Sequence, residues 1–226
     1  PILLSCPARR APELVIITLD GRPALAVFRE DVGAALAREM ERYTREWIEC
    51  MTGRDNRMVD INVLRTLTRG SQFFASTTML ILGALIALMG YAEKAASVVA
   101  GLPFTQQATE RVWEFKILVL LVIFVYAFFK FTWSIRQFGF GSILVGATGK
   151  PVADHAQYSV HIGRTAAIVS FANRNFNQGL RAYYFGVAAL CWFLHPALMI
   201  AVTLGVIYVL HQREFRSQTL DFLRRE

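Results

Sequence analysis

Arginine and amide side chains gather in three separate stretches of the sequence, each beside a long apolar run. The planar guanidinium of arginine can donate two hydrogen bonds to one phosphate or carboxylate, and amides add further donors and acceptors. If the apolar runs form bundled helices, the three stretches lie at one depth and can bind an anion, a lipid headgroup or a partner's acidic loop. The residues of this candidate rim are Arg54, Asp55, Asn56, Arg57, Asp60, Arg65, Arg69, Arg136, Gln137, Asn173, Arg174, Asn175 and Arg181.

The same charges also fit a simpler interpretation. Basic residues that flank a membrane helix hold that helix in place on the cytoplasmic side. Asp55, Asp60 and anionic lipid would then neutralise the arginines, with no further function. The residues alone leave both interpretations open.

A histidine lies inside the last apolar run, directly before a proline, as His195-Pro196. A titratable imidazole at membrane depth is costly and often marks a functional position. His195 is therefore a candidate intramembrane polar site for the passage of protons or ions. Alternatively, it forms a hydrogen bond to a backbone carbonyl that Pro196 leaves without a partner.

Metal-dependent and catalytic chemistry has little support in the sequence. His155 and His161 are about 120° apart on a helix, and no Cys or Glu completes a ligand set. The cysteines are far apart, at Cys6, Cys50 and Cys191. There is no Gly-x-Ser-x-Gly or His-Glu-x-x-His motif, and the glycine-rich stretch GFGSILVGATG lacks the Lys-Ser/Thr ending of a phosphate loop. We predict no catalytic residue, no metal site and no cofactor.

The composition indicates an integral membrane protein. Hydrophobic residues make up 54% of the 226 residues and charged residues only 18%. The uncharged run between Arg69 and Glu93 would form a helix of about 34 Å, enough for a hydrocarbon layer of roughly 30 Å. The sequence predicts an all-α, polytopic transmembrane protein with three spans, near residues 73–91, 115–138 and 183–210.

The segments outside the spans have different characters. Residues 1–30 predict a hairpin or an irregular segment, and the absence of an initial Met leaves open whether this is the native N-terminus. Residues 31–72 predict amphipathic cytoplasmic helices. The first carries an apolar stripe that includes Trp47, and this stripe packs on the rest of the protein, docks a partner, or lies along the membrane surface; we prefer the first of these. The second helix begins near Thr52 and runs into the first span. Residues 73–212 form the transmembrane domain, in which Lys116 and Lys130 anchor the second span by extending to opposite interfaces. Residues 213–226 form a charged tail.

The positive-inside rule places residues 53–72 and 136–182 in the cytoplasm. A single crossing by the last segment would then leave its basic tail outside. Two models remain: one long helix kinked at Pro196, which we prefer, or two half-helices that enter and leave on the cytoplasmic side.

Three blocks of sequence, RDNRMVDINVLRTLTRGSQFFASTTMLILGALIALMG, FKFTWSIRQFGFGSILVGA and NRNFNQGLRAYYFGVAALCWFLHPALM, carry a family resemblance over roughly residues 45–210. The chain resembles an uncharacterised membrane protein family, domain of unknown function 599. The resemblance implies a small polytopic membrane protein and supplies no activity. Family members usually carry a further apolar helix before the amphipathic one, so the number of spans, three or four, stays open.

Two functions remain as expectations. The first is a non-catalytic accessory or scaffolding membrane component whose basic rim contacts anionic lipid headgroups, a protein partner or a second copy. The alternative is a small transporter or channel that uses the His195-Pro196 break. The net charge of +7 does not indicate nucleic acid, because the basic residues flank apolar runs. A bacterial chain of this kind would lie in the inner membrane.

Overall fold

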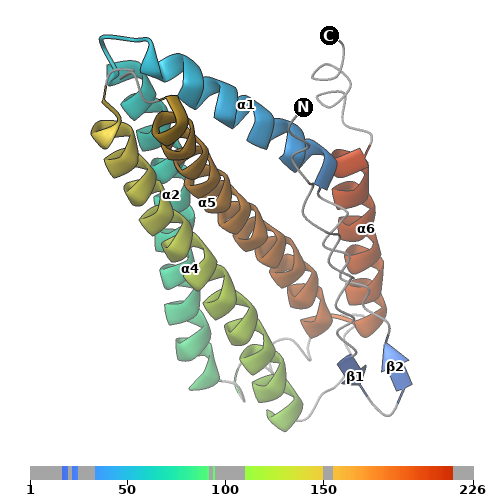
Figure 1. The fold of residues 1–226 in the computed structure, drawn as a ribbon. Helices are drawn as coiled ribbons and strands as arrows, with labels where there is room; N and C mark the ends of the chain where they lie inside the picture. The colour runs from blue at the N-terminus through green and yellow to red at the C-terminus, as the bar shows by residue number, and fades with distance from the viewer. Residues whose placement is uncertain are drawn as a thin grey trace.

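The computed structural model describes residues 17–19, 22–24, 34–91, 94, 110–149 and 155–215, and it is almost entirely helical over these ranges (Figure 1). The helices are α1 (Ala34–Thr52), α2 (Met58–Met89), α4 (Glu110–Ala147), α5 (His155–Leu190), the short 3₁₀ helix η2 (Cys191–Phe193) and α6 (Pro196–Phe215). Two short strands, β1 (Ile17–Leu19) and β2 (Arg22–Ala24), pair antiparallel. The rest of the predicted N-terminal segment and residues 216–226 of the tail lie outside the described residues.

Helices α2, α4, α5 and α6 alternate in direction, and α1 lies across one end of them (Figure 1). We call this end, where α2 begins and α4 finishes, the α1 end. Helix α4 lies between α2 and α5 and contacts both along its length, while α1 packs on α5. The predicted packing of an amphipathic helix on the rest of the protein is therefore found, with Ile48 and Met51 fully buried.

Two of the described helices are long and apolar enough to cross a membrane, Met58–Met89 and Arg111–Ala147. They contain most of the predicted spans 73–91 and 115–138, and the predicted continuity of the arginine-rich segment with the first span is found in α2. The third predicted span, 183–210, is not confirmed. Its second half forms the shorter apolar helix Pro196–Gln212.

The last apolar segment reverses direction instead of continuing as one helix. Helix α5 ends at Leu190, and the amides of Leu194 and His195 both donate to the carbonyl of Cys191, at 3.2 and 3.1 Å. Pro196 has no N–H to continue the helical hydrogen bonds, so a new helix begins there. Helix α6 returns toward the α1 end (Figure 1). The single kinked helix preferred from the sequence is not what the structure shows.

Phenylalanine side chains of α4 fit against glycines of α5 at matching heptad intervals. A methyl group on Gly179 would lie 2.6 Å from Phe131 Cε1, and one on Gly186 would lie 2.9 Å from Phe124 Cζ. Only a residue without Cβ admits the rings at these two positions. This close approach explains why α4 and α5 form the most extensive pair in the bundle.

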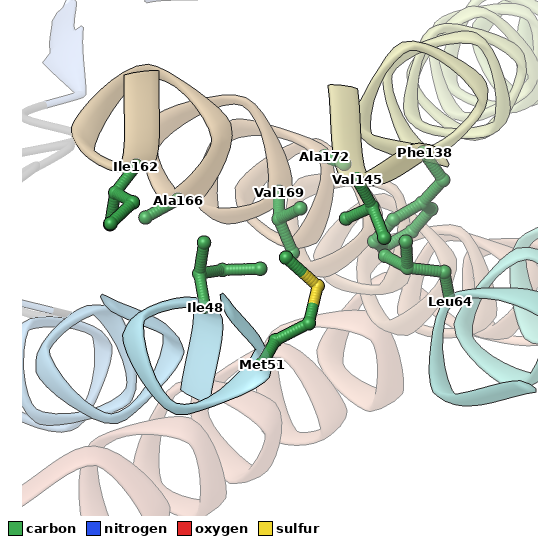
Figure 2. Packing of buried hydrophobic residues seen from close by; sticks show 9 residues of the cluster. All are labelled: Ile48, Met51, Leu64, Phe138, Val145, Ile162, Ala166, Val169 and Ala172. Atoms are coloured by element: carbon green, nitrogen blue, oxygen red, sulfur yellow. The ribbon is translucent and has the colours of Figure 1, made fainter. Parts of the chain in front are cut away.

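A separate apolar cluster lies at the α1 end, where side chains from four helices meet (Figure 2). Helix α1 contributes Ile48 and Met51, and Leu64 comes from α2. The remaining members come from α4 and α5: Phe138, Val145, Ile162, Ala166, Val169 and Ala172. The α1 end therefore has its own core, which fixes α1 relative to the other helices.

Candidate functional site

The centre of the first predicted polar stretch is Asp60, whose side chain is 0% exposed. Its Oδ1 accepts from Trp47 Nε1 at 2.8 Å and from Arg54 Nη1 at 2.7 Å. Its Oδ2 has no hydrogen-bond partner among the described residues. A carboxylate buried in this way is held by its donors, so Asp60 connects α1, the following turn and α2.

Arg57 binds the end of another helix. Its Nη1 donates to the carbonyls of Val145, at 3.2 Å, and of Thr148, and its Nη2 donates to the carbonyl of Gly149 at 3.2 Å. The last carbonyls of a helix lack intrahelical partners and carry partial negative charge, which a guanidinium satisfies. Arg57 therefore caps α4.

The start of α2 is set by Asn56 rather than by Thr52. Asn56 Oδ1 accepts from the amide of Met58 at 2.9 Å, which orders the first turn. Thr52 Oγ1 instead donates backwards to the carbonyl of Glu49 at 2.6 Å, as the last residue of α1. The predicted helix start at Thr52 is therefore wrong, because its hydroxyl hydrogen bonds within the preceding helix.

The second and third stretches meet through their amides. Asn175 Nδ2 lies 2.8 Å from Gln137 Oε1 and donates to the carbonyl of Phe171 at 3.0 Å, while Lys130 Nζ donates to Asn175 Oδ1 at 3.3 Å. One turn away, Ser134 Oγ donates to the carbonyl of Ala172 at 2.8 Å. These contacts join α4 to α5, and they use most of the hydrogen-bond donors and acceptors that these side chains could offer to a ligand.

Apart from Arg54, which pairs with Asp60, four arginines of the candidate rim are exposed: Arg65, Arg69, Arg136 and Arg174. Ser71 Oγ lies 3.2 Å from Ser134 Oγ, which sets the register of antiparallel α2 and α4. Arg69 and Arg136 each lie two residues from these serines toward the α1 end and are therefore at the same depth. Arg174 belongs to the same level of α5, and its Nη2 lies 4.0 Å from Glu41 Oε2 of α1. We call the four exposed arginines the arginine belt.

The remaining rim residues are not part of the arginine belt. Asp55 is exposed, while Asn173 and Arg181 are half-buried. Among the described residues no group of three His, Cys, Asp or Glu side chains could hold a metal ion. The structure thus divides the predicted rim into internal contacts around Asp60, Arg57 and Asn175 and an exposed belt.

Lys116 does not extend to solvent as predicted. Its side chain is buried, its Nζ donates to the carbonyl of Trp192 at 2.9 Å, and the ammonium lies 5.3 Å from the Trp192 ring centroid. The reversal after α5 leaves this carbonyl outside a regular helix, so the lysine is drawn inward to it. The anchor interpretation is therefore wrong for Lys116, which holds the turn between α5 and α6.

His195 is the N-cap of α6. Its Nδ1 accepts from the amide of Ala197 at 3.1 Å, and Pro196 occupies the first helical position. The imidazole thus bonds to a backbone donor of the new helix, whereas the sequence suggested a bond to a carbonyl. His195 is half-buried and has a structural task at the break.

A family model described as a protein of unknown function, DUF599, matches residues 24–219. The chain belongs to the DUF599 family. This match covers every helix of the structure and confirms the resemblance seen in the three sequence blocks. No curated protein and no solved structure matches the chain.

The sequence of this DUF599 chain did not indicate two internal hydrogen bonds, from Trp47 to Asp60 and from Lys116 to the carbonyl of Trp192. Trp47 was placed on the apolar stripe of an amphipathic helix, but its indole N–H needs an acceptor once buried, and Asp60 supplies it. The burial of Lys116 depends on the reversal after Leu190. The conflict between a single crossing and the basic tail was the signal that could have indicated this reversal.

Proposed function

We propose that this DUF599 protein is a multi-pass membrane protein with a non-catalytic accessory role, in which the arginine belt binds anionic lipid headgroups. The observation that carries the proposal is the position of the belt, which lies within about one helical turn of depth on three helices, directly beside exposed apolar surface.

The apolar side chains of α2 and α4 are exposed to an extent that water would not favour. Only 11% of the most apolar window of α2 and 33% of that of α4 is buried. On α2, Phe73 is 65% exposed and Leu80 is 76% exposed. The core helix of a water-soluble protein would be mostly buried, so these surfaces suit a hydrocarbon solvent.

Four helical segments fit the thickness of a bilayer on the side of the belt away from α1. Along α2, Ser71 to Met89 spans about 27 Å, and along α4, Trp113 to Ser134 spans about 32 Å, against a hydrocarbon layer of roughly 30 Å. The second half of α5 and the returning α6 would complete four crossings. Arg213, in the last turn of α6, and Arg216, directly after the helix, would then lie on the same side as the belt, as the positive-inside rule requires.

The belt lies where headgroup phosphates would be in this arrangement. Arg69 and Arg136 are exposed at equal depth, and the Arg136 guanidinium lies 5.6 Å from the Phe140 ring centroid. Exposed guanidiniums near an anionic surface each contribute about 1 kcal/mol to binding. The helical part beyond the belt, with α1 packed on its own core, would form a platform on the cytoplasmic face that can also contact a protein partner or a second copy. In a bacterial cell we expect such a protein in the inner membrane.

The transporter alternative receives no supporting observation. His195 Nδ1 is occupied by the Ala197 amide, and the central contacts of the bundle are aromatic rings packed edge to face or stacked, such as Phe74 on Phe131 at 5.3 Å. A polar path from one side to His195 is what the alternative would require.

The belt is tested by the double variant Arg69→Gln/Arg136→Gln, extracted with surrounding lipid in native nanodiscs. We expect the enrichment of phosphatidylglycerol over phosphatidylcholine to fall several-fold, since two phosphate-binding cations are lost. The control is Arg42→Gln/Arg45→Gln, which removes the same charge from arginines that pair with glutamates of α1. An unchanged lipid profile in the belt variant, or an equal change in the control, would reject the proposal.

A further inference from the structure

An apolar groove runs between α5 and α6. It encloses about 410 Å³ and is lined by Tyr184 of α5 and by Val202, Gly205, Val206, Val209 and Leu210 of α6. A Cβ on Gly205 would meet no atom within 4 Å, so the α6 wall of the groove is open at this residue. Helix α6 has no fully buried residue over the part whose side chains are described, which leaves this side of the helix to another occupant.

The α5 wall becomes basic on the way to the α1 end. Arg181 and Arg174 lie three and ten residues before Tyr184, which places them within about 80° of it on the helix. Arg174 reaches toward Glu41, so this face of α5 is turned toward α1. Helix α1 also contacts α6. Because Tyr184 lines the groove beside α6 and the arginines lie within about 80° of it, we place them on the part of the α5 surface that faces α1 and α6.

The charge of this region is of one sign. From His155 to Arg213, which covers α5 and nearly all of α6, the sequence contains no Asp or Glu. An anionic group at the upper part of the groove would therefore meet arginines and no carboxylate of α5. Glu41 of α1 lies 4.0 Å from Arg174, and Glu214 follows Leu210 by one turn in α6. Along α5, Arg181 lies about 9 Å further from the α1 end than Asn175 does. Its long side chain can extend back toward the interface and shorten this distance.

We infer that the groove between α5 and α6 is a binding site for one anionic phospholipid. One acyl chain lies against Tyr184 and Gly205, and the phosphate is bound by Arg181 with Arg174 beside it. The inference rests on the proposed membrane embedding but not on the arginine belt, which lies on other helices apart from Arg174. It deepens the lipid-binding role by giving it a single, defined site.

The test titrates dioleoyl phosphatidylglycerol, or dioleoyl phosphatidylcholine, into the delipidated full chain and counts bound lipid by native mass spectrometry. We expect one phosphatidylglycerol to bind more tightly than the next and more tightly than phosphatidylcholine. Gly205→Trp, which fills the groove, and Arg181→Gln should each weaken this first site about tenfold. Arg181→Lys should recover part of the loss, because it restores the charge but not the planar fork.

Two controls match these changes. Gly83→Trp places the same ring on an exposed glycine of α2 with equally open surroundings, and Arg164→Gln removes an exposed charge of α5 far from the groove. Both should bind the first lipid like the unmodified protein. Equal binding by Gly205→Trp, or a stable dimer that persists after delipidation and that Gly205→Trp disrupts, would overturn the inference. Vesicle integration of every variant, measured in parallel, separates this failure from a failure of membrane embedding.

Discussion

At the scale of single residues, cations and donors in this protein satisfy the ends of helices and one buried carboxylate. Arg57 caps α4, Lys116 holds the carbonyl of Trp192, and the imidazole of His195 caps α6. Each group sits where a helix end leaves polar atoms without partners. Some of the charges that suggest a binding site in the sequence therefore stabilise the fold instead.

Asp60 gives the clearest test at this scale. Replacing Asp60 by Ala should lower the free energy of unfolding by about 1–3 kcal/mol, because Trp47 Nε1 loses a buried acceptor and the half-exposed Arg54 loses its partner. Asp60→Asn keeps an acceptor oxygen and should cost less. Thermal unfolding in detergent measures the change, and Asp55→Asn, at an exposed position, is the control. Equal stability of Asp60→Ala and the unmodified protein would show that the carboxylate does not hold α1 to α2.

At the scale of elements, the bundle depends on how closely α4 approaches α5. Phe131 and Phe124 occupy space that only Gly179 and Gly186 leave open. In a bilayer, where lipid competes for apolar contact, such close packing contributes much of the association of helices.

Gly179→Ala or Gly186→Ala should therefore destabilise the protein by about 1–3 kcal/mol, since the added methyl group overlaps a ring. Gly83→Ala, on a helix surface with open space, should be neutral or slightly stabilising because alanine favours helix. The midpoint of unfolding in a denaturing detergent compares the three. A loss in Gly83→Ala as large as that in Gly179→Ala would contradict the packing account.

The sequence allows the helices to be predicted better than the turns between them. Long uncharged runs indicate α2 and α4, because run length alone decides whether a helix can span hydrocarbon. Pro196 indicates a break but not its angle, since a proline can kink a helix or begin a new one. Arg57 and Lys116 donate to backbone carbonyls because helix ends lie beside them in space. The distances between helices cannot be read from the pattern of a single sequence.

At the scale of the whole molecule, four helices that alternate in direction extend from an end that α1 covers (Figure 1). In the proposed arrangement the three basic stretches of the predicted rim and the tail lie on one side of the membrane, whereas a three-span topology would leave the tail outside. In this proposal the arginine belt marks the boundary between the part in lipid and the part in water. The central claim is thus that α5 and α6 complete two further crossings.

Labelling of single cysteines with a membrane-impermeant maleimide in sealed, oriented vesicles tests this claim most directly. With the other cysteines replaced by Ala, native Cys50 of α1 and Ser217→Cys after α6 should react from one side. Ala108→Cys, between α2 and α4, and Leu194→Cys, at the exposed turn before α6, should react only from the other side. Reaction of Leu194→Cys from the Cys50 side, or of Ser217→Cys from the Ala108 side, would contradict the four-crossing arrangement.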